Sequence, residues 1–309
     1  GGSGPFHVAS ENIIEVGNTS GKLFYSGATN GNDLPLAFPK GYKAFYIMKY
    51  EISQIQYWEF LNTLTPNQFA TRTAGASKYI MSNNASAVIR NGITAQGCDF
   101  NSNGVYNEAD DGQWIACNYL SWADLAAYTD WAALRPFTEL EFEKACRGPV
   151  ASFSNEYAWG STAITQATSI FHSGRIDEAA NNDGANCSYG NHGSVQGPLR
   201  CGFAVKTSTD CGSSYYGVMD LSGNLDERPV NVVTGSGFTG YNGNGALNAA
   251  DDGDVANWPL ISAAGVGFRG GNWFSSAASY LRVSDRSNAA NTNATRYSDS
   301  GGRAARTSP

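Results

Sequence analysis

Residues 134–148 read LRPFTELEFEKACRG and contain a complete start signal for a helix. Thr138 is the expected N-cap, and Glu141, three residues later, completes a capping box that satisfies backbone N–H groups at the helix start. Phe142 and Ala145 follow at helical spacing and are expected to face inward. The stretch therefore predicts a short helix directly after Thr138.

Earlier elements are predicted by the same kinds of pattern. Residues 45–52, FYIMKYEI, are rich in aromatic and β-branched side chains, which favours a strand. Ser53 is the expected N-cap of a helix that continues through Leu61. A further helix is expected from about Ser121 to Leu134, because its apolar residues recur at helical spacing.

Few charged residues and many glycines distinguish the composition. Of the 309 residues, 41% are hydrophobic, which is enough for a substantial core, but only 15% are charged and 36 are Gly. Such a chain has many turns, and after Gly148 we expect short strands and long loops without helices. The net charge of -7 argues against a nucleic-acid surface. No apolar run approaches the roughly 20 residues of a membrane span.

The cysteines favour disulfides or buried thiols over a metal site. None of the six forms a CxxC motif or has a histidine nearby, so zinc is not expected. Their even number permits three disulfides in an oxidising compartment, in any of several pairings. Cys98 and Cys117 bracket a polar loop and are the best candidate pair. Cys146 lies in a helical segment and is expected to be a buried thiol.

One polar loop has the spacing of a calcium-binding loop. Residues 99–112 read DFNSNGVYNEADDG, with oxygen-bearing side chains at positions 1, 3, 5, 9 and 12 and Gly104 at position 6 for the sharp turn. We expect a structural calcium ion that orders this loop; the alternative is an ordinary polar turn. The predicted ligands are Asp99, Asn101, Asn103, Val105, Asn107 and Asp110.

A related pattern returns at residues 240–253. Gly240 occupies the first position there, so a key carboxylate is missing. Asn, Asp and Gly are also the residues that ordinary turns prefer. We interpret this second copy as a turn.

Six motifs, taken in chain order, resemble the formylglycine-generating-enzyme (sulfatase-modifying factor) family. The likeness spans about residues 40–306 and implies an α+β domain of C-type-lectin-like topology, with sparse, irregular secondary structure and long loops. The motifs are MKYEIS at 48–53 with Gln56-Tyr57, SWAD at 121–124, the stretch at 134–148, YAWG at 157–160, GVMDLSGNL at 217–225 and FRGGNW at 268–273.

The sequence and the resemblance together suggest how the chain is organised. Residues 1–4, GGSG, are interpreted as a remnant of cloning, and residues 5–39 as an N-terminal extension packed on the domain. Residues 40–309 are expected to form a single domain. Its C-terminal part, about residues 270–306, is expected to be a variable region.

The family's own chemistry is not expected here. The family's enzyme oxidises a substrate cysteine with a pair of C-terminal cysteines, which must be thiolates that bind copper. In this chain the last cysteine is Cys211, and residues 272–282 read NWFSSAASYLR, with Ser and Tyr where thiols are needed. The aromatic residue often found after the Gly-Asn-Leu motif is replaced by Asp226. We therefore expect neither copper nor enzymatic activity; a family member with another activity is the alternative.

The C-terminal tract has the composition of a binding surface. Residues 274–302 contain no Lys, Glu, Gln, Met or Trp and consist largely of Ser, Asn, Asp, Thr, Ala, Tyr and Phe. Tyr supplies rigid contact area and Ser and Asn supply adaptable hydrogen bonds, the mixture that antibody loops use. We interpret the tract as a ligand-binding surface. The alternatives are a polar loop that is merely exposed and a fixed adhesion surface.

The genetic code favours the same interpretation. Phe, Ser, Tyr, Asp, Thr and Ala can all be reached from an Asn codon by changing only its adenines, whereas the five missing residue types cannot. Diversity-generating retroelements vary their target proteins by adenine-directed mutagenesis, and many such variable proteins resemble this family. We therefore expect a variable protein displayed outside the cell, on a cell or virion surface. Its partner would be a protein or glycan on another cell or virus.

Within the tract, scaffold and contact residues can be separated. Phe274, Tyr280 and Tyr297 should carry most of the affinity, because aromatic anchors dominate binding hot spots. The expected scaffold consists of apolar core residues and anchoring arginines: Trp273, Leu281, Val283, Arg282, Arg286 and Arg303. The contact candidates are Phe274, Ser275, Ser276, Ser279, Tyr280, Ser287, Asn288, Asn291, Asn293, Thr295, Tyr297, Ser298, Asp299 and Ser300.

Overall fold

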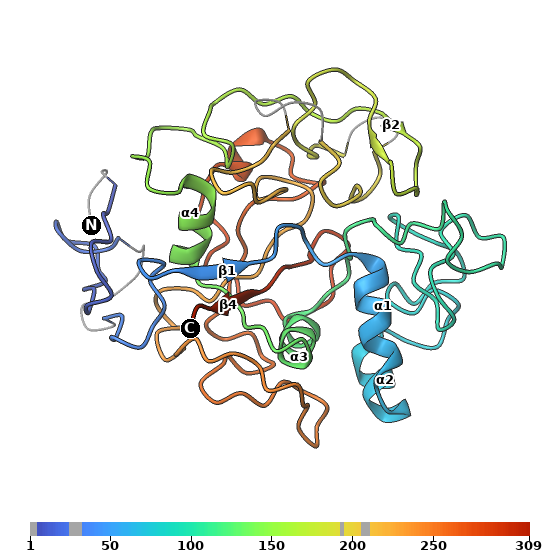
Figure 1. The fold of residues 1–309 in the computed structure, drawn as a ribbon, viewed down its shortest axis with the longest axis horizontal. Coiled ribbons are helices and arrows are strands. Elements are labelled where there is room, and N and C mark those ends of the chain that lie inside the picture. Colours follow the sequence, from blue (N-terminus) through green and yellow to red (C-terminus); the bar gives the residue numbers. More distant parts are fainter. Residues whose placement is uncertain (1–4, 25–32, 192–194, 205–210) are drawn as a thin grey trace.

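The computed structural model describes residues 5–24, 33–191, 195–204 and 211–309. Residues 1–4, interpreted above as a cloning remnant, lie outside the described residues, as does part of the expected N-terminal extension. Helices and short strands make up a small share of the chain and are joined by long loops (Figure 1). This mixed, loop-rich content agrees with the expected α+β class.

The α-helices of the described residues all precede Gly148, as expected. Each starts with a capping box; in the last of them Thr138 N donates to Glu141 Oε2 at 3.0 Å and Glu141 N donates to Thr138 Oγ1 at 3.2 Å. None of these helices is both long and apolar enough to cross a membrane. They are α1 (Gln54–Asn62), α2 (Pro66–Arg72), α3 (Trp122–Trp131) and α4 (Glu139–Arg147).

Two helices differ from the sequence expectation. α2 is not among the predicted elements, although Thr65 as N-cap, Pro66 in the first turn and Gln68 at the third position form a regular start signal. α3 begins after Ser121 as predicted but ends at Trp131 instead of near Leu134. The helix cannot continue because Ala133 has a φ of 53°.

The strands bring the beginning and the end of the domain together. β1 pairs antiparallel with β4, so the segment before α1 lies beside the C-terminal end (Figure 1). The predicted strand 45–52 is wrong after Ile47, where the regular ladder ends. Single hydrogen bonds continue the contact, from Met48 N to Ala304 O and from Ile52 N to Gly302 O, both at 2.9 Å. The strands are β1 (Phe45–Ile47), β2 (Ile170–Phe171), β3 (Ala179–Ala180) and β4 (Ala305–Thr307).

Two apolar clusters form most of the core. The larger one joins Ile14 of the N-terminal segment to Trp122 of α3 and to Val230 of the second half. A smaller cluster contains Phe142 and Ala145 of α4, which confirms that these two residues face inward. The helices are therefore held by residues far away in the sequence.

The expected bridge between Cys98 and Cys117 is wrong. Both residues are buried free thiols within the larger cluster. A buried thiol packs as a small apolar side chain, and the surrounding core closes without a covalent link. Cys146 is buried in the α4 cluster, as expected.

Buried charged side chains bond loop segments to one another. Arg303 and Glu227 have fully buried side chains and form an ion pair at 2.6 Å. The Arg303 guanidinium also donates to the carbonyls of Met48, Lys49 and Met219, at 3.2, 3.1 and 2.7 Å. One side chain thus ties the C-terminal segment to three other parts of the chain.

A second buried pair fixes the start of α4. Arg135 donates to both carboxylate oxygens of Glu141, at 2.8 and 2.6 Å. The same Glu141 side chain caps the helix through Thr138. Arg135 also donates to Thr307 Oγ1 at 2.7 Å, so the capping box is connected to β4.

We predict that Arg303→Met lowers the free energy of unfolding by about 3–5 kcal/mol, because the buried Glu227 carboxyl and three backbone carbonyls would lose the guanidinium that pairs with them. Arg175→Met is the matched control, since its pair with Asp177 is exposed, and it should leave stability nearly unchanged. Urea denaturation followed by tryptophan fluorescence measures both variants. Equal losses in the two would contradict the role assigned to the buried pair.

Candidate functional site

The C-terminal tract begins with a sharp turn at Gly270 and Gly271. Their φ values are +90° and +68°, and added Cβ atoms would lie 3.0 Å from Leu221 O and 3.0 Å from Leu281 Cδ1, respectively. Glycine fits here because it lacks the Cβ that would clash in this conformation. The turn leads into Asn272 and Trp273, which are both buried.

Buried residues fix the tract at intervals. Trp273, Leu281 and Val283 are at most 3% exposed, which confirms their expected core positions. The Trp273 indole Nε1 donates to Ser298 O at 3.0 Å, so the start of the tract is bonded to its end. Leu281 closes a 3-10 helix (Ala278–Leu281).

Arginine side chains also bond the C-terminal tract to the rest of the domain. Arg286 Nε donates to Glu139 Oε2 of α4 at 2.9 Å, and Arg303 forms the buried pair described above. These two predicted anchors are confirmed. The Arg282 side chain has no ion pair or hydrogen bond with a described residue, and its Nε is buried without a partner, so the expected anchoring through a carboxylate or a carbonyl is wrong. Its backbone N–H instead bonds Ser279 O at 3.4 Å.

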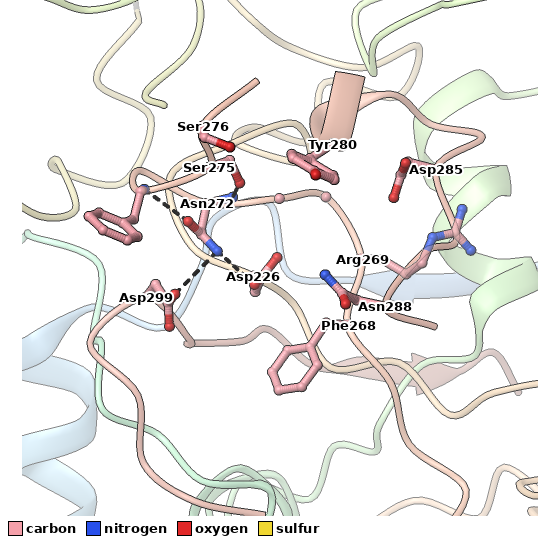
Figure 2. Close-up of a pocket in the computed structure, with 13 residues that line it drawn as sticks. Asp226, Phe268, Arg269, Asn272, Ser275, Ser276, Tyr280, Asp285, Asn288 and Asp299 are labelled. Carbon is pink, nitrogen blue, oxygen red and sulfur yellow. Dashed lines mark hydrogen bonds between the residues drawn. The ribbon is translucent and has the colours of Figure 1, made fainter. Parts of the chain in front are cut away.

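A cavity of about 250 Å³ opens beside the Gly270-Gly271 turn (Figure 2). Backbone of the turn, aromatic side chains and several carboxylates surround it. Its volume is near the lower end for small-molecule sites and suits a group the size of one side chain. The lining residues are Asp226, Phe268, Arg269, Gly270, Gly271, Asn272, Phe274, Ser275, Ser276, Tyr280, Asp285, Asn288 and Asp299.

Asn272 organises the polar side of the cavity. Its Nδ2 donates to Asp226 Oδ2 at 2.7 Å and to Asp299 Oδ2 at 3.5 Å (Figure 2). Its Oδ1 accepts from Phe274 N at 2.8 Å, and its own N–H donates to Ser275 Oγ at 3.0 Å. One buried amide therefore holds two carboxylates and the turn backbone together.

The carboxyl of Asp226 titrates near neutrality. Burial raises its pKa to about 7, the hydrogen bond from Asn272 opposes the rise, and the nearby charge of Asp299 adds to it. More distant charges act in both directions, since Arg228 lowers this pKa and Asp285 raises it. Burial also raises the pKa of Asp299. Ionised Asp226 is thus stabilised by any positive charge that enters the cavity.

The arginines near the cavity form no direct ion pair with Asp226 or Asp299 among the described residues. Arg269 donates to Glu139 at 2.9 Å and to Glu143 at 3.0 Å, so its charge is balanced by α4. Figure 2 shows its side chain directed toward that helix. Arg228 stacks on Phe268, with its guanidinium carbon 4.4 Å from the ring centre, and burial lowers its pKa to about 10. It remains a cation at neutral pH but does not line the cavity.

The structure gathers only part of the predicted contact set at the cavity. Ser300 is buried, and its hydroxyl donates to Leu120 O at 3.3 Å. Its assignment as a contact residue is therefore wrong. The predicted residues at the cavity are Phe274, Ser275, Ser276, Tyr280, Asn288 and Asp299. Those elsewhere on the tract are Ser279, Ser287, Asn291, Asn293, Thr295, Tyr297 and Ser298.

The most important residue that the sequence prediction missed is Asp226. Its N–H donates to Asp299 O at 2.9 Å and its carbonyl accepts from Gly301 N at 3.1 Å, so it lies against the end of the tract. The available signal was the acidic residue at a position where the family often has an aromatic one. The other cavity residues outside the predicted set are Phe268, Arg269, Gly270, Gly271, Asn272 and Asp285.

A copper site of the family's kind does not fit these residues. No sulfur atom is among the side chains that line the cavity in the described residues. Burial raises the pKa of the Cys98 thiol to about 12. It also raises the pKa values of four further thiols, which disfavours the thiolates that copper binding requires: Cys117, Cys146, Cys187 and Cys201.

The polar loop at residues 99–112 closes on itself. Asn101 Nδ2 donates to Asp110 Oδ1 at 3.1 Å, so predicted ligand positions 3 and 12 meet. Asp99 is fully buried, and its Oδ2 lies 2.8 Å from Lys78 Nζ. The predicted ligand at position 9 is Asn107, and its Oδ1 accepts a hydrogen bond from Cys98 N, directly before the loop, at 3.0 Å.

The carboxylates that converge in this loop differ from the predicted ligand set. Oxygens of Glu108, Asp110 and Asp111 lie within 4.8 Å of one another. Asp111 is fully buried, and its Oδ1 has no hydrogen-bond partner among the described residues. Burial raises the pKa of Asp111, and the neighbouring carboxylates of Asp99, Glu108 and Asp110 raise it further.

The second Asn/Asp loop is held by the protein itself. The carboxylate of Asp130 in α3 accepts from Asn244 N and from Asp254 N, both at 2.8 Å. These bonds organise the loop as a turn packed on the helix. A cavity of about 510 Å³ lies beside it and is lined by none of the predicted contact residues.

Comparisons with known proteins bear on the fold and the family. A search of curated proteins finds no match. Among solved structures the chain is similar to Treponema denticola variable protein 1, with 16% sequence identity, a TM-score of 0.37, and coverage of 85% of this chain and 84% of that one. The family model described as "Sulfatase-modifying factor enzyme 1-like domain" matches residues 14–308. The chain therefore belongs to the sulfatase-modifying factor enzyme 1-like domain family.

Proposed function

We propose that the protein is a non-catalytic, ligand-binding display protein with a C-type-lectin-like topology, whose C-terminal tract forms the recognition surface. The main support is the cavity beside the Gly270-Gly271 turn, to which aromatic, hydroxyl and amide side chains of that tract contribute. Rigid aromatic groups together with short polar side chains are the composition of antibody-like contact surfaces. Its ligand would be a protein or glycan presented outside the cell.

The division between scaffold and contact residues supports variability of this surface. Phe274, Tyr280 and Tyr297 are 56, 43 and 44% exposed, whereas Trp273 and Leu281 beside them are buried. Exposed side chains can be exchanged with little effect on stability, whereas buried ones cannot. A tract built in this way tolerates diversification by a retroelement without losing its fold.

The state of the cysteines supports a role other than the family's oxidation chemistry. That chemistry needs accessible thiolates, whereas burial raises the pKa values of the thiols named above. The side chains at the cavity can instead form hydrogen bonds, ion pairs and aromatic contacts. We therefore propose reversible binding as its activity.

The triple variant Phe274→Ser/Tyr280→Ser/Tyr297→Ser should stay folded, with a loss of about 1.5 kcal/mol or less, because each change is at the surface. Trp273→Ser should cost about 3–5 kcal/mol, because it empties a buried site. Urea denaturation compares the two variants with the unaltered protein. A triple variant as unstable as Trp273→Ser would contradict the assignment of these aromatics to an exchangeable surface.

The retroelement part of the proposal has a genetic test. Sequencing of the DNA around the gene should find a near-repeat of the last coding segment that differs at adenines, together with a reverse transcriptase gene. These are expected because adenine-directed copying needs a template and an enzyme. If both are missing, diversification is excluded and the binding surface is the part of the proposal that stands.

We also propose a structural calcium ion in the loop at residues 99–112, with a ligand set different from the one the spacing predicts. Glu108, Asp110 and Asp111 are the central carboxylates, since their oxygens converge and Asp111 has a buried oxygen without a partner. Calcium prefers six to eight oxygen ligands, and the amide side chains of the loop supply further ones. Such an ion would relieve the repulsion among the carboxylates.

Calcium at about 100 times its Kd should stabilise the protein by about 2.7 kcal/mol and raise Tm by several degrees relative to the protein in chelator. Asp110→Asn and Asp111→Asn should reduce this response, because each removes a ligand charge. Asp251→Asn, at the corresponding last position of the second loop, is the matched control and should respond as the unaltered protein does. If both loop variants keep the full calcium-dependent rise in Tm, the assignment of a calcium site to this loop is wrong.

A further inference from the structure

We propose that the cavity beside Gly270 and Gly271 selects a ligand that presents an organic ammonium group. This inference rests on the proposed binding function and specifies the chemical class of ligand. It concerns the cavity itself, which is partly built by residues outside the variable tract. Three properties of the cavity favour such a ligand: its charge, its aromatic side chains and its hydrogen-bonding capacity.

The charge at the cavity is negative. Asp226, Asp285 and Asp299 all line it, and none of the three forms an ion pair with a described residue. The arginine that lines it, Arg269, is bound by Glu139 and Glu143. A cation that enters would therefore meet carboxyl groups without a direct ion-pair partner and would stabilise their charged forms, whereas an anion would be repelled by those forms.

The carboxylates also have free accepting capacity. A carboxylate has two oxygens and about four acceptor sites, and Asp226 receives the Asn272 amide on only one of its oxygens. Asp285 accepts from the backbone and hydroxyl of Ser287 through Oδ1 alone. An ammonium group donates three hydrogen bonds and accepts none, which matches a cavity rich in acceptors.

The aromatic side chains favour an organic cation over a metal ion. Phe274 and Tyr280 line the cavity and are 56 and 43% exposed, so their rings are accessible to a ligand. An aromatic face attracts an organic cation and also packs on its carbon atoms. Phe268 already has such a contact, with the guanidinium of Arg228.

Binding of an ammonium group should depend on pH. Asp226 faces Asn272, Asp299, Asp285 and Arg228, and together with burial these groups place its pKa at about 7. Its raised pKa means that the neutral form predominates below that value and the charged form above it. The ligand stays protonated until about pH 10, as a lysine does. Affinity should therefore rise with pH through about 7, by up to tenfold per unit on the acidic side.

The test compares three probes of similar shape: 2-phenylethylammonium, 2-phenylethanol and 3-phenylpropionate. Each is titrated into the full chain, isotopically labelled, and the backbone amide resonances of Gly270, Gly271 and Asn272 are followed by NMR. We expect saturable shifts with the ammonium probe and affinity at least tenfold weaker for the alcohol and the carboxylate. The titration with the ammonium probe is repeated at pH 6 and pH 8, where the affinity should increase.

Asp226→Asn is the decisive variant, because it removes the charge and keeps the shape of the side chain. It should lower the affinity for the ammonium probe at least tenfold and abolish the pH dependence of binding. Asp299→Asn is a second variant, in case the first does not fold. Asp254→Asn, an exposed carboxylate outside the cavity, is the matched control and should bind as the unaltered protein does.

The outcomes separate this inference from the proposed function. Three results would overturn the selection of an ammonium group. They are tighter binding of the carboxylate probe, equal binding of all three probes, and no binding of any probe at 10 mM. Binding of the alcohol or the carboxylate at the same residues keeps the binding function and rejects only the ligand class. The proposed function itself fails on its own test, if the exposed aromatics prove essential for folding.

Discussion

The buried backbone of this protein has to be hydrogen-bonded without the help of extended sheets. Its described strands are two or three residues long, so most buried N–H and C=O groups belong to loops. Charged side chains in the core supply the missing partners. Arg303 bonds three carbonyls from two segments, and Glu51 accepts from Leu225 N at 2.9 Å and from the Asn224 amide. The Arg303 charge has an ion-pair partner of its own in Glu227, whereas burial raises the pKa of the Glu51 carboxyl well above its usual range.

The candidate site depends directly on this network. Asp226 and Glu227 are adjacent in sequence, and their side chains have separate environments, the cavity for one and the core pair with Arg303 for the other. Glu227 exchanges backbone hydrogen bonds with Arg269, at 3.0 and 2.9 Å. The core pair therefore positions the cavity carboxylate and the segment that leads into the Gly270-Gly271 turn. The core pair and the cavity share these backbone contacts but use different side chains.

The same separation continues along the C-terminal tract. Its buried residues bond to fixed parts of the fold, as when Trp273 reaches Ser298 and Arg286 reaches Glu139. Its exposed residues meet solvent and the cavity, and they contribute little to the core. Side chains such as Phe274 and Tyr280 can thus be exchanged while the scaffold stays the same, as the proposed function requires. The acidic cavity residue Asp226 lies outside the tract and would give every variant a common preference for positive charge.

Local sequence determined the helix starts, because a capping box such as Thr138 with Glu141 is complete within a few residues. It also determined the burial of Trp273 and Leu281 beside exposed neighbours in the C-terminal tract. Only the tertiary structure decided that Cys98 and Cys117 are free, that Ser300 is buried, and that Asp226 meets Asp299 at a cavity. These facts depend on contacts between residues far apart in the chain, whose geometry follows from how loops pack and not from any local pattern.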